Sequence, residues 1–247
     1  MAKLESYDRT LSYSYAPGLF PATECLNAIP ERCHRLLISS KIRMSDPVNA
    51  LIEKAESLHV RVETADRVLE RLSKKENCFA AVVYEKAEGS LDPAGAHIVL
   101  HEPSDTGNVG TIIRTALGMG YTNIAIIRPA VDTDDPRVVR ASMGACFSVN
   151  IEHFDSFESY RERYADHQLY LFMLKGSDTL NEVTGKVQRP LSLVFGNEAR
   201  GLPDAFAEYG IPVRIPHSNR IDSLNLAIAA GIGMYALAQQ NVGQGEK

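Results

Sequence analysis

Membrane and export signals are missing from this sequence of 247 residues. The N-terminus, MAKLESYDRT, has no apolar signal-peptide core, which argues against secretion. The longest apolar run, residues 227–238, is too short and too rich in alanine and glycine to span a bilayer. We therefore expect a cytoplasmic protein that does not contact a membrane, with residues 227–238 in a buried helix.

Cysteine is scarce. The four cysteines, Cys25, Cys33, Cys78 and Cys146, are widely separated, with no C-x-x-C pair and no histidine at ligand spacing. These spacings disfavour a disulfide framework and a zinc site, so we predict reduced thiols and no bound metal.

A basic excess is absent as well. Acidic residues outnumber basic ones by 31 to 26, which gives a formal charge of −5. This balance disfavours a protein that coats nucleic acid non-specifically, although local basic patches can still bind RNA. Two sets of basic residues fit either such patches or a solvated face: Arg32, Arg35, Lys41 and Arg43, then Arg128, Arg137, Arg140 and Arg220.

The first part of the chain alternates between strand and helix patterns. Residues 1–20 are polar, tyrosine-rich and without a clear period, so we expect an arm or loop there. After them come predicted strands at 33–39, 60–65 and 78–85 and predicted helices at 46–59 and 65–77. This alternation indicates a small α/β domain over about residues 20–86. The Gly-, Pro- and Ser-containing stretch 86–95 is typical of a linker, so we place one domain at 1–90 and another at 96–247.

The second part shows the same alternation with more strongly apolar strands. Continuous rather than alternating apolar runs are typical of a parallel sheet covered on both faces. The predicted strands are 97–103, 123–129, 149–154, 168–176, 190–195 and 211–217, and the predicted helices are 108–120, 135–149, 156–167, 203–210 and 223–241. Residues 242–247 are expected to be frayed.

Three loops that follow predicted strands combine Gly or Asn with Ser, Glu or Arg: HEPSDTGNVG (101–110), FGNEARGLP (195–203) and IPHSNRIDSLN (215–225). Ligands bind at the carboxyl ends of the strands in open parallel sheets. None of the loops is a Walker loop, and GMGYTN (118–123) lacks the third glycine of a dinucleotide fingerprint, which disfavours a dehydrogenase. A tight turn that caps a strand remains an alternative for FGNEARG.

Arg114 is the only charged residue between positions 106 and 120. It lies one or two turns after the start of the predicted helix, near the loop that precedes it. The side chain either snorkels from an apolar helix or pairs with a core carboxylate such as Glu198, or it meets a phosphate or sugar of a substrate.

These loops resemble, in order, the three signature motifs of the SpoU/TrmH family of RNA ribose 2′-O-methyltransferases. The resembling segments are NVGTIIRTALGMG, LVFGNEARGL and IPHSNRIDSLNLAIAAGIGMY, and the similarity covers about residues 97–240. The resemblance implies a SPOUT-type α/β fold, with a parallel sheet and a C-terminal trefoil knot that holds S-adenosylmethionine. It also implies a homodimer, and a smaller N-terminal α/β domain that binds RNA.

The resemblance assigns roles residue by residue. Arg114 would activate the ribose 2′-hydroxyl, Asn108 would position the RNA or Arg114, and Glu198, Ser223 and Asn225 would order the catalytic site. The cofactor would be held by main-chain groups of Gly196, Ile215 and Leu224, together with Leu174 and Ser223. His217 departs from the family, which more often has Met after the proline; a variable loop position and a role in substrate choice both remain open.

We therefore expect an RNA 2′-O-methyltransferase that uses S-adenosylmethionine, with ribosomal RNA the preferred substrate and transfer RNA the next. A catalytically silent RNA- or ribosome-binding member of the same fold is the alternative. The joint presence of Asn108, Arg114, Glu198, Ser223 and Asn225 favours the enzyme.

Overall fold

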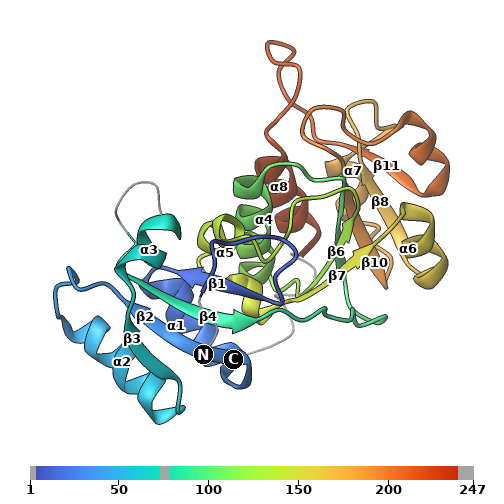
Figure 1. Ribbon diagram of the computed structural model, residues 1–247. Coiled ribbons are helices and arrows are strands. Elements are labelled where there is room, and N and C mark those ends of the chain that lie inside the picture. The colour runs from blue at the N-terminus through green and yellow to red at the C-terminus, as the bar shows by residue number, and fades with distance from the viewer. Residues whose placement is uncertain (1–3, 73–77, 239–247) are drawn as a thin grey trace, which may run out of the picture. The chain divides into compact units, whose positions relative to one another are not determined.

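The computed structural model describes residues 4–72 and 78–238, and the chain forms two compact units (Figure 1). The first unit consists of residues up to 87 together with 132–148, and the second of residues 88–131 together with those from 149 on. The chain therefore passes between the units three times. A single linker at 86–95 does not describe this connectivity, because 132–148 lies within the predicted C-terminal domain and yet belongs to the first unit.

The first unit is built on a mixed four-stranded sheet in the order β1-β4-β2-β3. Strand β4 pairs antiparallel with β1 and β2, and β2 pairs parallel with β3. The strands are β1 (Tyr13–Pro17), β2 (Cys33–Ile38), β3 (Arg61–Thr64) and β4 (Ala80–Glu85). Strand β1 corrects the expectation of an irregular arm over residues 1–20: its five residues are too few to give a clear period, yet its Tyr15 is fully buried.

Helices cover both faces of this sheet. They are α1 (Leu19–Ala28), α2 (Asp46–Ser57) and α3 (Asp66–Leu72), with a 3₁₀ turn at Pro30–Arg32. One core, which contains Leu26, Leu36 and Leu51, lies between the sheet and helices α1 and α2. A second core, around Tyr15 and Leu69, lies beneath α3. The predicted helix at 65–77 is confirmed as far as Leu72, and its remainder lies outside the described residues.

Polar contacts hold residues 132–148 in the first unit. The hydroxyl of Tyr84 donates to Asp134 Oδ1 at 2.8 Å, and Lys86 Nζ lies 3.2 Å from Asp132 Oδ2. Helix α5 (Pro136–Ala141) follows and buries Val139 in the core of the unit. The predicted helix at 135–149 is shorter than expected because Met143 and Gly144 both have positive φ, after which a 3₁₀ turn runs over Ala145–Ser148.

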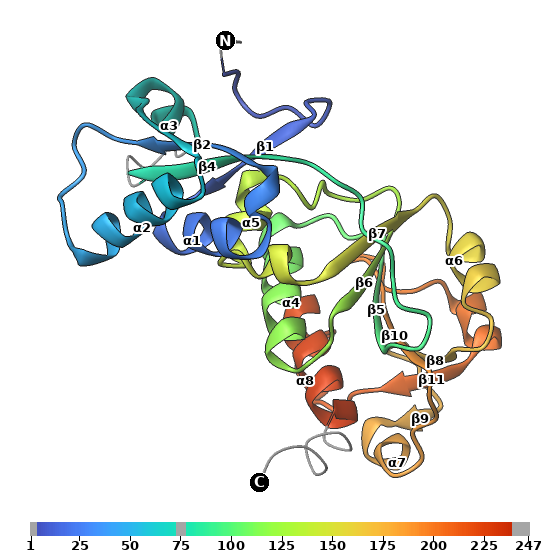
Figure 2. The ribbon, with the colours of Figure 1, turned by 90° about the horizontal axis from the view of Figure 1, so that it is seen from below.

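A seven-stranded, fully parallel sheet forms the second unit, in the order β7-β6-β5-β10-β8-β11-β9 (Figure 2). Its strands are β5 (His97–His101), β6 (Asn123–Ile127), β7 (Asn150–Phe154), β8 (Gln168–Phe172), β9 (Asp178–Thr179), β10 (Leu191–Phe195) and β11 (Ile211–Arg214). The central strand β10 is completely buried, as the continuous apolar run predicted. The short strand β9 was not predicted, since two residues carry no periodic signal.

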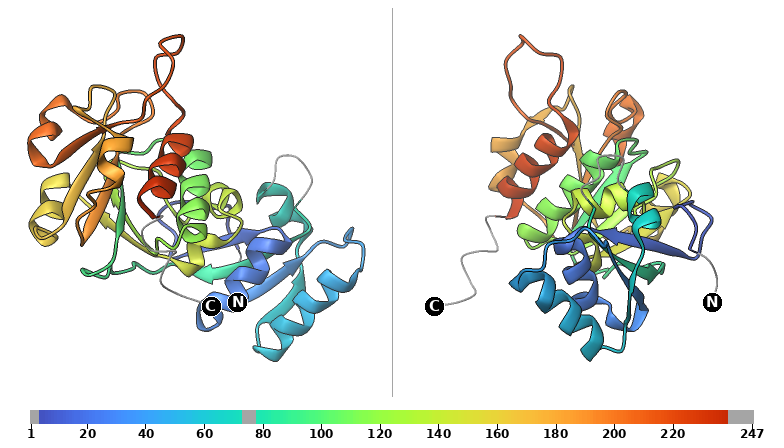
Figure 3. Two further views of the ribbon diagram at one scale, coloured as in Figure 1. Left: turned by 180° about the vertical axis from the view of Figure 1, so that it is seen from behind. Right: turned by 60° about the vertical axis from the view of Figure 1, so that its left-hand side comes forward.

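Helices α4 (Thr106–Gly118) and α8 (Leu226–Ala238) lie side by side on one face of this sheet, and α6 (Phe157–Arg163) lies on the other (Figures 2 and 3). A short helix α7 (Leu180–Thr184), which was not predicted, follows β9, and residues Asp204–Tyr209 form a 3₁₀ helix. The last predicted helix begins at Leu226 rather than at Ser223, and its part beyond 238 lies outside the described residues. Both α4 and α8 begin at the carboxyl ends of strands, so their first turns meet at one edge of the sheet.

The amino ends of the strands are closed by a buried polar cluster. The hydroxyl of Tyr160 lies 2.9 Å from His97 Nδ1 and 2.6 Å from Ser192 Oγ, and His167 Nδ1 lies 2.9 Å from the same serine oxygen. Burial lowers the pKa of His97 to about 4, so its ring is neutral at neutral pH. This edge of the sheet is thus filled by side chains, and the cavity described below lies at the other.

Candidate functional site

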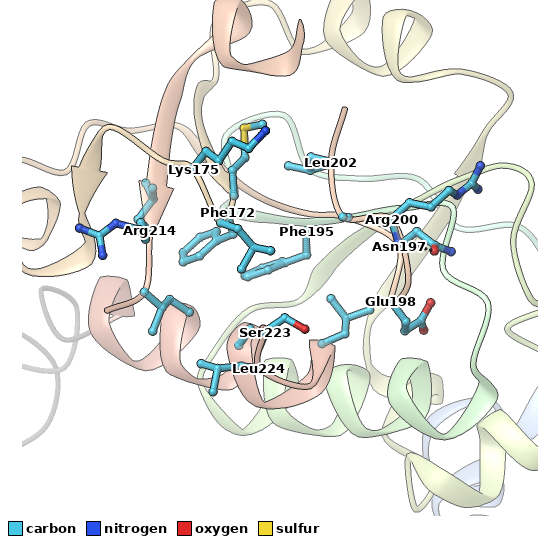
Figure 4. A pocket seen from close by; sticks show the side chains of 18 of the residues that line it. Phe172, Lys175, Phe195, Asn197, Glu198, Arg200, Leu202, Arg214, Ser223 and Leu224 are labelled. Carbon is cyan, nitrogen blue, oxygen red and sulfur yellow. Dashed lines mark hydrogen bonds between the residues drawn. The ribbon is translucent and has the colours of Figure 1, made fainter. Parts of the chain in front are cut away.

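Three loops at the carboxyl ends of β8, β10 and β11 surround a cavity of about 320 Å³ (Figure 4). The loops are residues 173–175, 196–204 and 215–224. Every residue predicted to hold the cofactor lies on its wall: Leu174, Gly196, Ile215, Ser223 and Leu224. Glu198, which was predicted to order the catalytic site, lies on the wall as well; the cofactor contacts of the other five and the role of Glu198 remain predictions.

The carboxylate of Glu198 joins the loop after β10 to the loop after β5. Its Oε2 accepts hydrogen bonds from Ser104 N at 3.0 Å and Ser104 Oγ at 2.7 Å. Its Oε1 accepts from Asp105 N at 3.1 Å and from Asn108 Nδ2 at 3.4 Å. Although partial burial opposes ionisation, these donors lower the pKa of Glu198, because each of them favours the charged form. Glu198 is therefore a fixed anion rather than a proton acceptor at neutral pH.

Asn108 and Asn225 extend this contact to the last helix. Because Asn108 directs its amide nitrogen at Glu198, its Oδ1 faces Asn225 and accepts from Asn225 Nδ2 at 3.0 Å. The Oδ1 of Asn225 then accepts from the backbone of Ala227 and Ile228 and so caps the first turn of α8. We call Ser104, Asp105, Asn108, Glu198 and Asn225 the Glu198 network.

The FGNEARG loop does form a tight turn, and Asn197 closes it. Its Oδ1 accepts from Ala199 N at 2.9 Å and Arg200 N at 3.2 Å, while its Nδ2 donates to the carbonyl of Glu102 at 2.8 Å. A Cβ on Gly196 would lie 2.1 Å from the carbonyl carbon of Gly201, so only glycine fits at this crossing. The turn and the cavity wall are therefore one feature, and the two interpretations of this loop do not exclude each other.

Aromatic rings form the inner end of the cavity. The rings of Phe172 and Phe195 stack with their centroids 4.4 Å apart, and Figure 4 shows them between the three loops. Helix α8 lies directly against them, because a Cβ on Gly233 would come within 2.6 Å of Phe172 Cζ and 3.2 Å of Phe195 Cζ. The shape of the cavity thus depends on a glycine that does not line it.

Arg114 lies outside the cavity wall. It is exposed on α4, six residues after Asn108, which corresponds to about 9 Å along a helix axis. Within residues 4–72 and 78–238 no hydrogen bond or ion pair of Arg114 is found, and Glu198 binds other donors. The predicted alternative of an Arg114–Glu198 pair is therefore wrong, and the guanidinium is available to a ligand.

Sequence reasoning missed Ser104, Asn197 and the ion pair between Arg200 Nη2 and Glu102 Oε2, which are 2.6 Å apart. Ser104 lies in the same quoted loop as Asn108, and Asn197 directly precedes Glu198. Their positions in these two loops were the available signal. No signal in the sequence pointed to Glu102. Its φ is 52°, and a left-handed backbone conformation at a glutamate cannot be predicted from composition.

Nothing in the described parts of the chain suggests a metal centre or a membrane segment. No group of three or more His, Cys, Asp or Glu side chains there could hold a metal ion, and no helix there is long and apolar enough to cross a bilayer.

Residues 95–235, more than half of the chain, match the model of the SpoU rRNA methylase family. The chain belongs to this family. The fold class predicted from the sequence, a SPOUT-type parallel α/β sheet with a smaller α/β part before it, is confirmed by its solved relatives.

Three similar proteins illustrate the range of the family. An uncharacterised tRNA/rRNA methyltransferase from Synechocystis is 33% identical over 146 residues, which are 58% of this chain and 53% of that protein, so this chain spans about half its length. An AdoMet-bound rRNA methyltransferase from Sinorhizobium meliloti superposes with a TM-score of 0.78 at 26% identity, covering 93% of this chain and 88% of that one. A structure concerned with the 2-OH methylation of C/U34 on tRNA superposes with a TM-score of 0.56 at 29% identity. The superposition covers 62% of this chain and 100% of that one.

The close packing of α8 against Phe172 yields a prediction. Gly233→Ala should push the Phe172 ring into the cavity, because the added Cβ would otherwise overlap it. We expect binding of S-adenosylmethionine, the ligand of the S. meliloti protein, to weaken by about tenfold or more in calorimetry.

Gly231→Ala is the matched control. It lies on the same helix, and its Cβ would lie 3.7 Å from Thr115 Cγ2, an ordinary contact. It should bind the cofactor like the unaltered chain. Equal affinities for the two variants would show that Gly233 does not shape the cavity.

Proposed function

We propose that this protein is an RNA methyltransferase that transfers a methyl group from S-adenosylmethionine to a ribose 2′-hydroxyl. The observation that carries the proposal is the cavity at the carboxyl ends of β8, β10 and β11, joined by the Glu198 network to the helix that bears Arg114. Family membership supports the reaction class.

The cavity fits the cofactor. Its volume of about 320 Å³ lies within the range typical of small-molecule sites, and its wall combines apolar side chains with loop backbone. Gly196, Ile215 and Leu224 would hold it through main-chain groups, with Leu174 and Ser223 beside them. S-adenosylmethionine, when bound, supplies a methyl group on a sulfonium cation.

Arg114 acts on the RNA in this proposal. An arginine is a poor base at its ordinary pKa above about 12, so it serves by hydrogen-bonding the 2′-hydroxyl and a neighbouring phosphate. Asn108 and Asn225 each use one amide N–H inside the Glu198 network, and the second N–H of each can still donate to RNA. We assign them, with Glu198, the task of fixing the loops.

The substrate we favour is ribosomal RNA. The S. meliloti rRNA methyltransferase aligns with 93% of this chain, which includes most of the first unit. The structure concerned with tRNA methylation is aligned over its whole length and yet covers only 62% of this chain. It therefore has no counterpart of the rest of this chain. Transfer RNA is the alternative, and we assign RNA binding to the first unit.

Several of the basic residues predicted to bind RNA have partners within the chain, but exposed pairs of this kind contribute little and leave the cations able to contact RNA. The guanidinium of Arg32 donates to the carbonyl of Glu85, Lys41 lies 3.6 Å from Glu70, and Arg128 lies 2.8 Å from Asp155. Arg43 and Arg220 are the members of the two sets for which the described residues provide no such contact.

A cytoplasmic location remains a prediction.

A homodimer completes the proposal. Ile228, Ile232 and Tyr235 lie on one face of α8 and expose 56%, 38% and 56% of their surface. Spacings of four and three residues place them in one stripe beside α4, where Met119 is also exposed. A stripe of this kind is typical of an interface, and a second copy would cover it.

Arg114→Ala should abolish methylation of the RNA and leave S-adenosylmethionine binding within about twofold, because Arg114 lies outside the cavity wall. The measurement is methyl transfer to ribosomal and transfer RNA from a strain that lacks the enzyme, with calorimetry of the cofactor. Lys186→Ala removes an exposed positive charge elsewhere in the second unit and serves as the control. Methylation that persists in Arg114→Ala would contradict the role of Arg114, and cofactor binding without transfer to any RNA by the unaltered chain would favour the silent family member.

Sedimentation velocity tests the dimer. The unaltered chain should sediment as two copies, and Ile232→Asp should sediment as one, because a carboxylate cannot be buried unpaired in an apolar interface. Phe20→Asp, at a residue that is 69% exposed in the first unit, should remain dimeric. A single copy for the unaltered chain would contradict the proposal.

A further inference from the structure

His217 is an ionisable side chain on the wall of the cofactor cavity that the proposed reaction does not use. It is half-buried on the loop after β11. Its Nδ1 lies 2.8 Å from the carbonyl oxygen of Ile215. A carbonyl can only accept, so Nδ1 carries the proton and donates to Ile215, and Nε2 is where the neutral ring takes up a further proton.

The other charges on the cavity wall compensate one another. Lys175 Nζ lies 3.2 Å from Asp204 Oδ2, and Arg200 is paired with Glu102 behind the wall. Glu198 is held by its four donors, and Arg214 lies at the end of β11. The lining charges are Lys175, Arg200 and Arg214 against Glu198 and Asp204, and Arg220 and Asp222 stand further along the loop of His217. Glu102 and Glu182 lie off the wall and interact with Arg200 and Arg214, and proton uptake by His217 adds one positive charge to the wall.

We propose that His217 is a specificity-determining residue that sets the preference of the cavity between the sulfonium cofactor and the thioether product according to its charge. The inference rests on the proposed function. S-adenosylmethionine carries a positive sulfur that S-adenosylhomocysteine lacks, and the two molecules otherwise share their charged groups. A cationic His217 therefore disfavours the cofactor relative to the product, because like charges repel and the product lacks the charge on sulfur.

The experiment is calorimetry of both molecules between pH 5.5 and 7.5, analysed as the ratio of their dissociation constants, cofactor over product. Groups that the two ligands share cancel in this ratio. As the pH falls across this interval, the ratio should rise on the order of tenfold in the unaltered chain.

Two variants at the same position isolate the charge. His217→Met should hold the ratio at its high-pH value throughout, since its side chain is neutral at every pH. His217→Lys should hold it at the low-pH value, since its charge is permanent. Both variants must still bind the product, which shows that the cavity is intact.

Each other outcome overturns the inference. If the ratio does not change with pH in the unaltered chain, no titrating group discriminates between the two ligands. If it still changes in His217→Met, a group other than His217 does so. Failure of the unaltered chain to bind either molecule would overturn the proposed function together with this inference, whereas binding of both at a constant ratio overturns the inference alone.

Discussion

The carboxylate of Glu198 is the contact on which the site depends. It accepts hydrogen bonds from the loop after β5 and from Asn108, which in turn accepts from Asn225. The loop after β5 and the start of α4 are thereby fixed to two segments that follow them by 90 to 117 residues in sequence. An anion with this many donors is ionised and oriented, and the donors are oriented with it. The cavity wall is a consequence of this arrangement.

Close packing of backbone accounts for the rest of the cavity. Gly196 lets the loop after β10 cross itself, and Gly233 lets α8 lie against the Phe172 and Phe195 rings. The chemistry is then divided. Backbone and aromatic surface form the cavity, while Arg114 is exposed on α4 outside its wall. In the function we propose, the cofactor site and the cation that acts on the ribose lie apart within one chain, which suits a reaction between a small cofactor and a large RNA.

The sequence was most informative where the pattern was local. Continuous apolar runs predicted the central strands of the parallel sheet, and the loops after them contain the residues of the cavity wall. What could not be predicted depends on contacts between distant residues. Tyr84 and Lys86 hold Asp134 and Asp132, and so draw residues 132–148 into the first unit. The pairing of Glu198 with Ser104 rather than Arg114 has the same cause, since spacing does not show which donors a carboxylate meets.

The most direct test of this account is the affinity of Glu198→Gln for S-adenosylmethionine. In Glu198→Gln an amide nitrogen replaces one carboxylate oxygen, and it would face the donors of Ser104 or those of Asp105 and Asn108. Each donor left without an acceptor destabilises this arrangement of the loops by about 1–3 kcal/mol. We predict a dissociation constant raised about tenfold or more. Asp66→Asn, whose carboxylate accepts from Ser39 and Ser40 within the first unit, should leave it unchanged. An unaltered affinity in Glu198→Gln would contradict the account.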